Sequence, residues 1–489
     1  MKFSLSVLST ALSLALASPL LHYKPDQILT SSSFAIHSSD DFPEYALATK
    51  EIDPASLGLD TVAQHSGYLE VKSSGENFFY WAFESRNDPS KDPVVLWLQG
   101  GPGSSSMFAL TFENGPSLIN NPEIKPIHNP WSWNNNATMI YLDQPAGAGF
   151  SYVSAGGTAS RTSKEAAKSV FAFLTLFFEK YPHLPRKIHI SGESYAGHYV
   201  PQTTLEILRT ANKTFHVESM LCGNGMTDPL NQYTEFSVYG CDSQASGVSP
   251  ALYSNETCQQ ARAAQDRCIP LIQKCYDTGT NADCSYATSH CNAEILSLFD
   301  NEKNIYDVRR PCEPSKSGTC YKESDYGEAF LNNQTTRDAI GAIVPWKANN
   351  RTVYNDFTVY TGDWMRPDSV RAVTDILNGY NVPVLIFAGD KDFICNWLGQ
   401  KKWLDALPWD GHAKYLKARE RPWKVNHQSR GVLKQFGKLS FLRIFEAGHM
   451  VPHDQPEAAS FMLQEWLTET LGIWDYKDYE YGLTGPQFK

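Results

Sequence analysis

A serine flanked by small residues follows a short apolar stretch of the kind that forms a buried strand. Residues 188–191 read IHIS and run directly into residues 192–197, which read GESYAG. A strand, a tight turn carrying the serine and a helix form a nucleophile elbow, in which small neighbours allow the strained backbone of the serine. Ser194 is therefore a candidate nucleophile. The alternative is an ordinary Gly/Ser turn between a strand and a helix.

A serine hydroxyl near neutral pH needs a base to take its proton and an acid to orient that base. Asp390 and Asp392 follow the apolar run 384–388, and His449 follows the apolar run 441–445. The chain order serine, aspartate, histidine is that of the α/β hydrolases and differs from the orders in chymotrypsin and subtilisin. These positions predict a triad built from three loops at the ends of strands.

Five short apolar runs supply the strands that such a triad needs. They cover residues 94–98, 139–142, 188–190, 384–388 and 441–445. Between them, Thr162 and Glu165 have the spacing of a capping box at the start of a helix whose apolar face extends to Phe178. Strands that alternate with helices predict an α/β fold, with a mostly parallel sheet and helices on both faces.

Cysteine usage indicates an oxidising compartment. Eight of the ten cysteines lie between residues 241 and 320, which predicts a disulfide-stapled cap insertion over about residues 230–330. No pair has the C-x₂-C spacing of a zinc site, so no metal is expected. Cys222 and Cys395 stand apart and are expected to be free thiols. The spacing does not set the connectivity of the other eight: Cys241, Cys258, Cys268, Cys275, Cys284, Cys291, Cys312 and Cys320.

The N-terminus has the features of a signal peptide. Residues 1–17 contain one lysine, an apolar stretch and a final small-x-small triplet. Residues 18–49 are rich in serine and aspartate and predict a pro-segment or mobile N-terminal arm, which leaves 50–489 for the catalytic domain. No later stretch approaches the length of a membrane span. We expect a protein of the secretory pathway that is secreted, with the vacuole as the alternative.

Five sequons fit the N-glycosylation pattern and agree with that route. Their acceptors are Asn136, Asn212, Asn255, Asn333 and Asn350.

The composition excludes other classes of protein. The 489 residues carry 42 basic and 53 acidic side chains, a formal charge of −11 that argues against a nucleic-acid partner. A 42% hydrophobic share with 12% aromatics is far from the composition of a disordered chain. The sequence does not determine an oligomeric state.

Four segments resemble the signature blocks of the serine carboxypeptidases: residues 97–105, 192–197, 389–397 and 448–452. The resemblance extends from about Lys50 to the C-terminal helix and implies the α/β-hydrolase fold. It implies Ser194 as nucleophile, His449 as base and Asp392, rather than Asp390, as the orienting acid. The backbone N–H groups of Gly101 and Tyr195 would form the oxyanion hole.

The resemblance also implies a site for the free carboxylate of a peptide C-terminus, formed by Trp97, Gln99, Gly100, Glu113 and Glu193. Two buried carboxyls held close together cannot both ionise cheaply, so one keeps its proton and can donate a hydrogen bond to an anion. Such a site binds carboxylate in acid and loses it once both glutamates are charged.

Further implications of the resemblance concern the pockets and the disulfides. Cys395 and Met450 are expected at the substrate pockets. The implied bridges are 241–258, 268–291, 275–284 and 312–320. Two positions depart from the family pattern: Gln99 stands where an asparagine is usual, and Ser104 stands where related sequences carry a disulfide cysteine. No cysteine lies in the matching partner region, residues 346–355.

The sequence therefore predicts a serine carboxypeptidase that releases C-terminal residues from peptides and proteins at acidic pH through an acyl-enzyme, without metal or cofactor. Its substrates are peptide C-termini, and no nucleic-acid or membrane partner is expected. One alternative is an esterase or lipase of the same fold, which would not need the two glutamates. The other is a catalytically idle, glycosylated binding protein.

Overall fold

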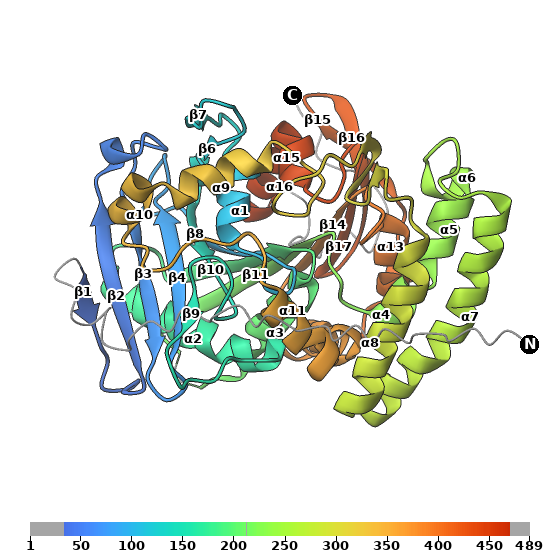
Figure 1. Cartoon of the computed structure of the whole chain (residues 1–489), viewed down its shortest axis with the longest axis horizontal. Coiled ribbons are helices and arrows are strands. Elements are labelled where there is room, and N and C mark those ends of the chain that lie inside the picture. The colour runs from blue at the N-terminus through green and yellow to red at the C-terminus, as the bar shows by residue number, and fades with distance from the viewer. Residues whose placement is uncertain (1–33, 212, 470–489) are drawn as a thin grey trace, which may run out of the picture.

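A single large sheet organises the computed structural model, which describes residues 34–469 except residue 212 (Figure 1). Six neighbouring strands in its centre, from β8 to β17 in the sheet order, run parallel. Antiparallel strands extend the sheet at both edges. The strands in sheet order are β1 (Ala35–His37), β2 (Tyr45–Ile52), β3 (Gln64–Val71), β4 (Glu76–Phe83), β8 (Thr138–Leu142), β5 (Val94–Leu98), β10 (Lys187–Glu193), β11 (His216–Gly223), β14 (Val384–Gly389), β17 (Leu439–Ile444), β16 (Gln428–Phe436) and β15 (Arg421–Val425).

Small strands and helices complete the described chain. β9 (Tyr152–Val153) pairs with β4, β6 (Ser117–Leu118) with β7 (Ile127–His128), and β12 (Lys303–Asn304) with β13 (Asp307–Pro311). The α-helices are α1 (Ser106–Phe112), α2 (Ser163–Lys180), α3 (Ala196–Arg209), α4 (Pro229–Gln232), α5 (Glu235–Cys241), α6 (Ser243–Ser246), α7 (Asn255–Thr278), α8 (Asn281–Ile295), α9 (Ser324–Asn332), α10 (Gln334–Ile340), α11 (Arg351–Asn355), α12 (Asp368–Asp375), α13 (Trp397–Ala406), α14 (His412–Lys417), α15 (Val451–Asp454) and α16 (Pro456–Leu467).

The central strands are buried on both faces, which explains their continuous apolar sequences. On β5, Val94, Leu96 and Leu98 face one hydrophobic core, which α2, α3 and α12 cover. Val95 and Trp97 face a second core, which α1, α9 and α16 cover. The predicted fold, a mostly parallel sheet with helices on both faces, is confirmed, and each of the five predicted apolar runs lies in a strand of the sheet.

Helix α2 begins where the capping pattern predicts. The hydroxyl of Thr162 accepts a hydrogen bond from the N–H of Glu165 at 3.2 Å. The Glu165 carboxylate accepts from the N–H of Arg161 at 2.8 Å, one residue earlier than the capping box requires. The helix places Phe173 and Phe177 against Tyr80 of β4, at ring-centroid distances of 5.0 and 5.8 Å.

The N-terminal region differs from the prediction. Residues 34–49, expected in a pro-segment or mobile arm, contribute β1 and most of β2, and β2 pairs with β3 over its whole length. Leu47 is fully buried in the same core as Phe78, so this stretch belongs to the folded body. The apolar residues within 42–52 explain the difference, since they cover an edge of the sheet that would otherwise be exposed. The predicted signal peptide lies outside the described residues.

Helices α5 to α8 form the cap at one end of the sheet (Figure 1). Disulfides join Cys241 to Cys258, Cys275 to Cys284 and Cys312 to Cys320, as the resemblance implied. In the described chain, no helix has both the length and the apolar character needed to cross a membrane.

The implied bridge between Cys268 and Cys291 is not formed in this structure, which corrects that expectation. Both cysteines are free and buried on the facing helices α7 and α8. Hydrogen bonding between the two sulfurs raises the pKa of the Cys291 thiol. The pair is therefore in contact, but as thiols. Cys222 and Cys395 are free and buried, as expected.

Three of the sequon acceptors, Asn136, Asn255 and Asn333, are exposed, and Asn212 lies outside the described residues. Asn350 is different because its side-chain nitrogen, the atom that a glycan would occupy, donates to the carbonyl of Gly147 at 2.9 Å. The structure disfavours glycosylation at Asn350.

Buried His65 on β3 links β2 to the residue that follows β4, and through it to the loop after α2. The two ring nitrogens of buried His65 lie 2.6 Å from the Glu51 carboxylate and 2.9 Å from the Glu84 carboxylate, and Glu84 also contacts His183 at 2.8 Å. Burial alone would lower the pKa of His65, but the bonds to both glutamates raise it above its ordinary value. The bond from His65 lowers the pKa of Glu51; at Glu84, the bonds from His65 and His183 outweigh burial and lower that pKa too.

The signs of these shifts predict a stability window. The raised pKa of His65 stabilises the fold below about pH 6.5, and the lowered pKa values of Glu51 and Glu84 stabilise it above about pH 4.5. The variant His65→Gln should therefore lose about 1–2 kcal/mol of unfolding free energy near pH 5.5 and less near pH 8. Urea unfolding followed by fluorescence measures the unfolding free energy of the variant and of the wild type at each pH. His216→Gln, at an exposed position on β11, is the control, and equal losses at the two pH values would refute the ion-pair account.

Candidate active site

The candidate nucleophile sits on a strained turn at the end of a central strand. β10 ends at Glu193, α3 begins at Ala196, and Ser194 between them has φ = 67°, a value that L-residues rarely adopt. The N–H of Ser194 donates to the carbonyl of Gly223 on the neighbouring strand β11 at 3.1 Å. This is the geometry of a nucleophile elbow.

The acid and the base meet after β14 and β17, the second and third strands beyond β10 in the sheet order. Nδ1 of His449, which follows β17, lies 2.8 Å from Oδ2 of Asp392, which follows β14. Asp392 is fully buried and also accepts the backbone N–H groups of Ile394 at 3.0 Å and Cys395 at 3.2 Å. Asp390 instead accepts the N–H of Glu446 at 2.9 Å. The geometry therefore pairs His449 with Asp392 and not with Asp390.

Sequence reasoning missed Asn224, which holds the acid from a third strand. Directly after β11, its Nδ2 donates to Asp392 Oδ2 at 2.8 Å, and its Oδ1 accepts the N–H of Gly389 at 3.0 Å. The asparagine thereby fixes the Asp392 carboxylate and the end of β14 together. A polar residue just past an apolar run was the available signal, but many loop residues share it.

A segment of the cap insertion ties the acid loop to the histidine loop. The N–H of His449 donates to the carbonyl of Tyr306 at 2.7 Å, and the N–H of Phe393 donates to the carbonyl of Ile305 at 3.2 Å. The N–H of Val308 donates back to the carbonyl of Lys391 at 3.0 Å. Residues 305–308 thus bind both loops through backbone hydrogen bonds, which carry no side-chain signature in the sequence.

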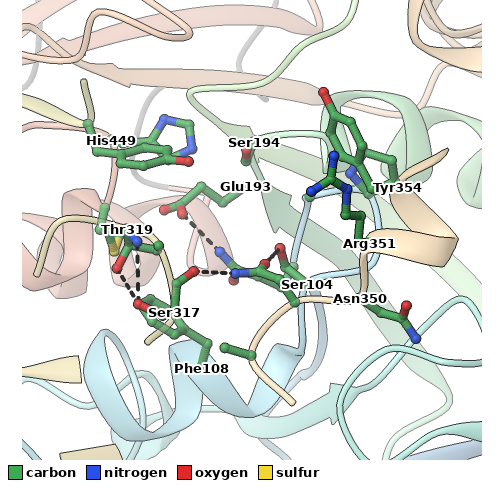
Figure 2. Close-up of a pocket in the computed structure, with 18 of the residues that line it drawn as sticks. Ser104, Phe108, Glu193, Ser194, Ser317, Thr319, Asn350, Arg351, Tyr354 and His449 are labelled. Atoms are coloured by element: carbon green, nitrogen blue, oxygen red, sulfur yellow. Dashed lines mark hydrogen bonds between the residues drawn. The ribbon is translucent and has the colours of Figure 1, made fainter. Parts of the chain in front are cut away.

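Ser194 and His449 line the same cavity, which has a volume of about 480 Å³ (Figure 2). Nε2 of His449 is buried without a hydrogen-bond partner among the described residues. The two side chains are therefore not hydrogen-bonded to each other here, but the ring nitrogen opposite the Asp392 bond is free to accept a proton. Catalytic hydrogen bonds are often long in structures without substrate.

Three groups in the described chain, Asp392, Cys395 and His449, offer potential metal-ligand atoms within 4.8 Å of one another. The His449 Nδ1 and Asp392 Oδ2 atoms already satisfy each other. Burial raises the pKa of the Cys395 thiol, whereas a metal ligand must be a thiolate. The arrangement fits a catalytic triad better than a metal centre.

The loop after β5 approaches the elbow closely. A Cβ atom on Gly100 would lie 2.3 Å from the backbone nitrogen of Tyr195, and Gly101 has φ = 107°. A glycine at each position is therefore required for the loop to pass beside the elbow. The buried side chain of Asp143 fixes the end of this loop. It accepts hydrogen bonds from the hydroxyl of Ser105 at 2.6 Å and from the N–H of Ser106 at 2.8 Å. The predicted oxyanion-hole residues, Gly101 and Tyr195, thus belong to two adjoining backbone segments.

A row of buried polar side chains leads away from Ser194. The indole N–H of Trp97 donates to Gln99 Oε1 at 2.8 Å, and Gln99 Nε2 donates to Glu193 Oε1 at 3.1 Å. Glu113, at the end of α1, lies beside Glu193, and both glutamates are at most 1% exposed. Burial raises the pKa of both carboxyls, and the nearby charge of Glu113 raises that of Glu193 further. The structure brings together the predicted carboxylate-binding residues, and Gln99 keeps the expected amide contacts despite its longer side chain.

The two predicted pocket residues behave differently. Met450 lines the cavity together with Phe108 and Tyr306. Cys395 is 5% exposed and does not line it. Its backbone N–H donates to Asp392 at 3.2 Å, and its sulfur lies within 4.8 Å of side-chain atoms of Asp392 and His449, so a role for Cys395 at a substrate pocket stays a prediction.

Hydrogen bonds occupy the place of the absent family disulfide. Ser104 and Asn349 form an isolated β-bridge, and the hydroxyl of Ser104 donates to the side-chain oxygen of Asn349. The Asn349 amide also donates to the carbonyl of Ser317 at 2.5 Å. All three residues line the cavity, so these bonds join three segments of its rim.

Comparison with known proteins finds similar chains and a similar fold. The fold resembles a crystal structure of a prohormone-processing carboxypeptidase from Saccharomyces cerevisiae, with a TM-score of 0.71, 23% identity and coverage of 86% of this chain and 95% of that one. Carboxypeptidase Y of Komagataella phaffii is 43% identical over 433 residues, 88% of this chain and 80% of the relative. A vacuolar serine-type carboxypeptidase of Saccharomyces cerevisiae is 43% identical over 444 residues, 89% of this chain and 85% of the relative.

A family model described as serine carboxypeptidase matches residues 54–469, which include the elbow, both triad loops and the glutamate pair. The chain therefore belongs to the serine carboxypeptidase family and is a hydrolase of peptide C-termini.

Proposed function

We propose that Ser194 attacks the carbonyl of the last peptide bond, that His449 takes its proton and returns it to the leaving amine, and that Asp392 orients the imidazole. The bond from His449 Nδ1 to Asp392 leaves Nε2 without a partner among the described residues, and His449 and Ser194 line one cavity, which supports a base that acts on Ser194. Attack forms an acyl-enzyme and releases the C-terminal residue, and water then releases the shortened peptide. The N–H groups of Gly101 and Tyr195 would stabilise the oxyanion in both steps.

The observation that carries the exopeptidase assignment is the buried glutamate pair beside the nucleophile. A proton retained between Glu113 and Glu193 turns one carboxyl into a hydrogen-bond donor, and Gln99 and Trp97 hold the pair in place. A peptide carboxylate can then bind where an isolated pair of anions would repel it. An esterase of the same fold would have no use for this arrangement.

The cellular location that best fits the relatives is the vacuole. We therefore propose the vacuole, the alternative predicted from the sequence, ahead of secretion. One similar yeast protein is named as vacuolar, and the buried acid pair suits an acidic compartment. The N-terminal signal peptide remains a prediction that would deliver the chain to the secretory pathway.

The triad assignment predicts a specific pattern of loss. Ser194→Ala should abolish hydrolysis and labelling by a fluorophosphonate, and Asp392→Asn should lower kcat by about 10⁴-fold because it favours the wrong imidazole tautomer. Asp390→Asn is the matched control, two residues from the triad acid, and should keep wild-type kinetics. Labelling of the Ser194→Ala protein at wild-type rate, or equal losses in the two aspartate variants, would contradict the assignment.

The glutamate pair predicts different pH profiles for different substrates. Because both pKa values are raised, the donating proton persists through acidic pH and is lost as pH rises past neutrality. Hydrolysis of a blocked dipeptide with a free carboxylate should therefore fall by about 10–100-fold in kcat/KM toward pH 9. A blocked amino-acid ethyl ester, which has no carboxylate, should stay active there.

The variant Glu113→Gln tests the same account. Its amide does not ionise, so KM for the free-acid dipeptide should vary less with pH while ester hydrolysis is unchanged. Glu123→Gln, at an exposed position, is the control. The account fails if free-acid hydrolysis is undiminished well above neutrality, or if a C-terminal amide is cleaved as readily as the acid at pH 5.

A further inference from the structure

One cationic side chain lines the substrate cavity without a partner. Arg351, the first residue of α11, is exposed at the cavity wall and makes no hydrogen bond or ion pair with other described residues. The remaining ionisable groups of the described lining, tyrosines aside, are Glu193 and His449, which belong to the machinery proposed above. Arg351 is thus a positive charge that the mechanism does not use.

Packing places Arg351 on the acyl side of Ser194. Tyr354 lies three residues further along α11, on the same helix face, and its ring lies 6.2 Å from that of Trp364. Trp364 in turn stacks on Tyr195, the residue after the nucleophile, at 5.3 Å. In Figure 2, Arg351 and Tyr354 lie on the opposite side of Ser194 from Phe108 and Thr319.

The part of the cavity that would hold the released C-terminal residue is closed, unlike the acyl side. Its end is the carboxylate-binding row, in which Gln99, Glu113 and Glu193 are all buried. A peptide whose C-terminal carboxylate is bound there can extend only in the other direction, across the acyl side. The residues upstream of the scissile bond must therefore pass the wall that carries Arg351 and Tyr354.

We propose that Arg351 is a specificity-determining residue, which favours peptides with an acidic side chain at the second residue before the scissile bond. The inference rests on the proposed carboxypeptidase mechanism and adds a substrate preference to it. The whole chain carries a formal charge of −11, which disfavours acidic peptides in general. A local cation beside the peptide path offsets that repulsion.

The test uses blocked tripeptides that differ only in the first residue, which is glutamate, glutamine or lysine, followed by the same two apolar residues. At about pH 5.5 a glutamate side chain is mostly ionised, while the Glu113–Glu193 site still binds carboxylate. An exposed ion pair should make the wild-type kcat/KM for the glutamate peptide about two- to fivefold that for the glutamine peptide. The preference should shrink at about 1 M salt because the pair is screened.

Two variants and a control isolate the residue. Arg351→Gln should reduce the glutamate-to-glutamine ratio to about one, and Arg351→Glu should invert it in favour of the lysine peptide. Arg419→Gln removes the same charge from an exposed position between α14 and β15, outside the cavity lining, and should keep the wild-type ratio.

The outcomes separate this inference from the mechanism it rests on. If the wild-type protein shows no preference for the glutamate peptide, or if Arg351→Gln keeps the wild-type ratio, Arg351 does not act on the acyl side. In either case hydrolysis of the glutamine peptide continues and the proposed function stands. If the wild-type protein releases no C-terminal residue from any tripeptide, the proposed function itself is wrong.

Discussion

The site depends on supplying hydrogen-bond donors to one fully buried carboxyl group, that of Asp392. A polar group in such a position is costly to the fold unless its oxygens accept hydrogen bonds. Asp392 accepts its hydrogen bonds from the ring of His449, the side chain of Asn224 and two backbone N–H groups of its own loop. These donors follow β17, β11 and β14. The hydrogen bonds to Asp392 therefore fix the ends of these three neighbouring strands relative to one another. Residues 305–308 of the insertion then lock the same loops from outside.

The two buried glutamates near the nucleophile show the opposite electrostatic behaviour, because their pKa values are raised. Glu113 and Glu193 are buried as deeply as Asp392, but several of their oxygens have no partner among the described residues. With few donors available, burial favours the neutral form and the pKa values rise. Acids in neighbouring environments therefore have different tasks: the hydrogen-bonded Asp392 orients a base, and the glutamates hold a proton.

The sequence predicts this site only as far as local patterns extend. The strands of the sheet were predictable because a strand buried on both faces reads as an unbroken apolar run, and the triad because its loops follow those runs. Asn224 was not, since an asparagine after a strand has many possible roles. The Tyr306 segment was missed because it acts through backbone carbonyls. Strand β2 was hidden beside a serine- and aspartate-rich stretch.

The same limit applies to the cysteines. Three pairings implied by the resemblance are present, but whether Cys268 and Cys291 are bonded or only touching depends on how two helices approach each other. Spacing along the chain carries no information on that approach.

The link between Ser104 and Asn349 has a consequence for how the mouth of the enzyme behaves. A covalent staple at this place would open only by chemical reduction, whereas these contacts break and reform spontaneously with thermal motion. This link is therefore insensitive to thiols, and the disulfide between Cys312 and Cys320, whose loop carries Ser317, is a covalent constraint that remains at the rim.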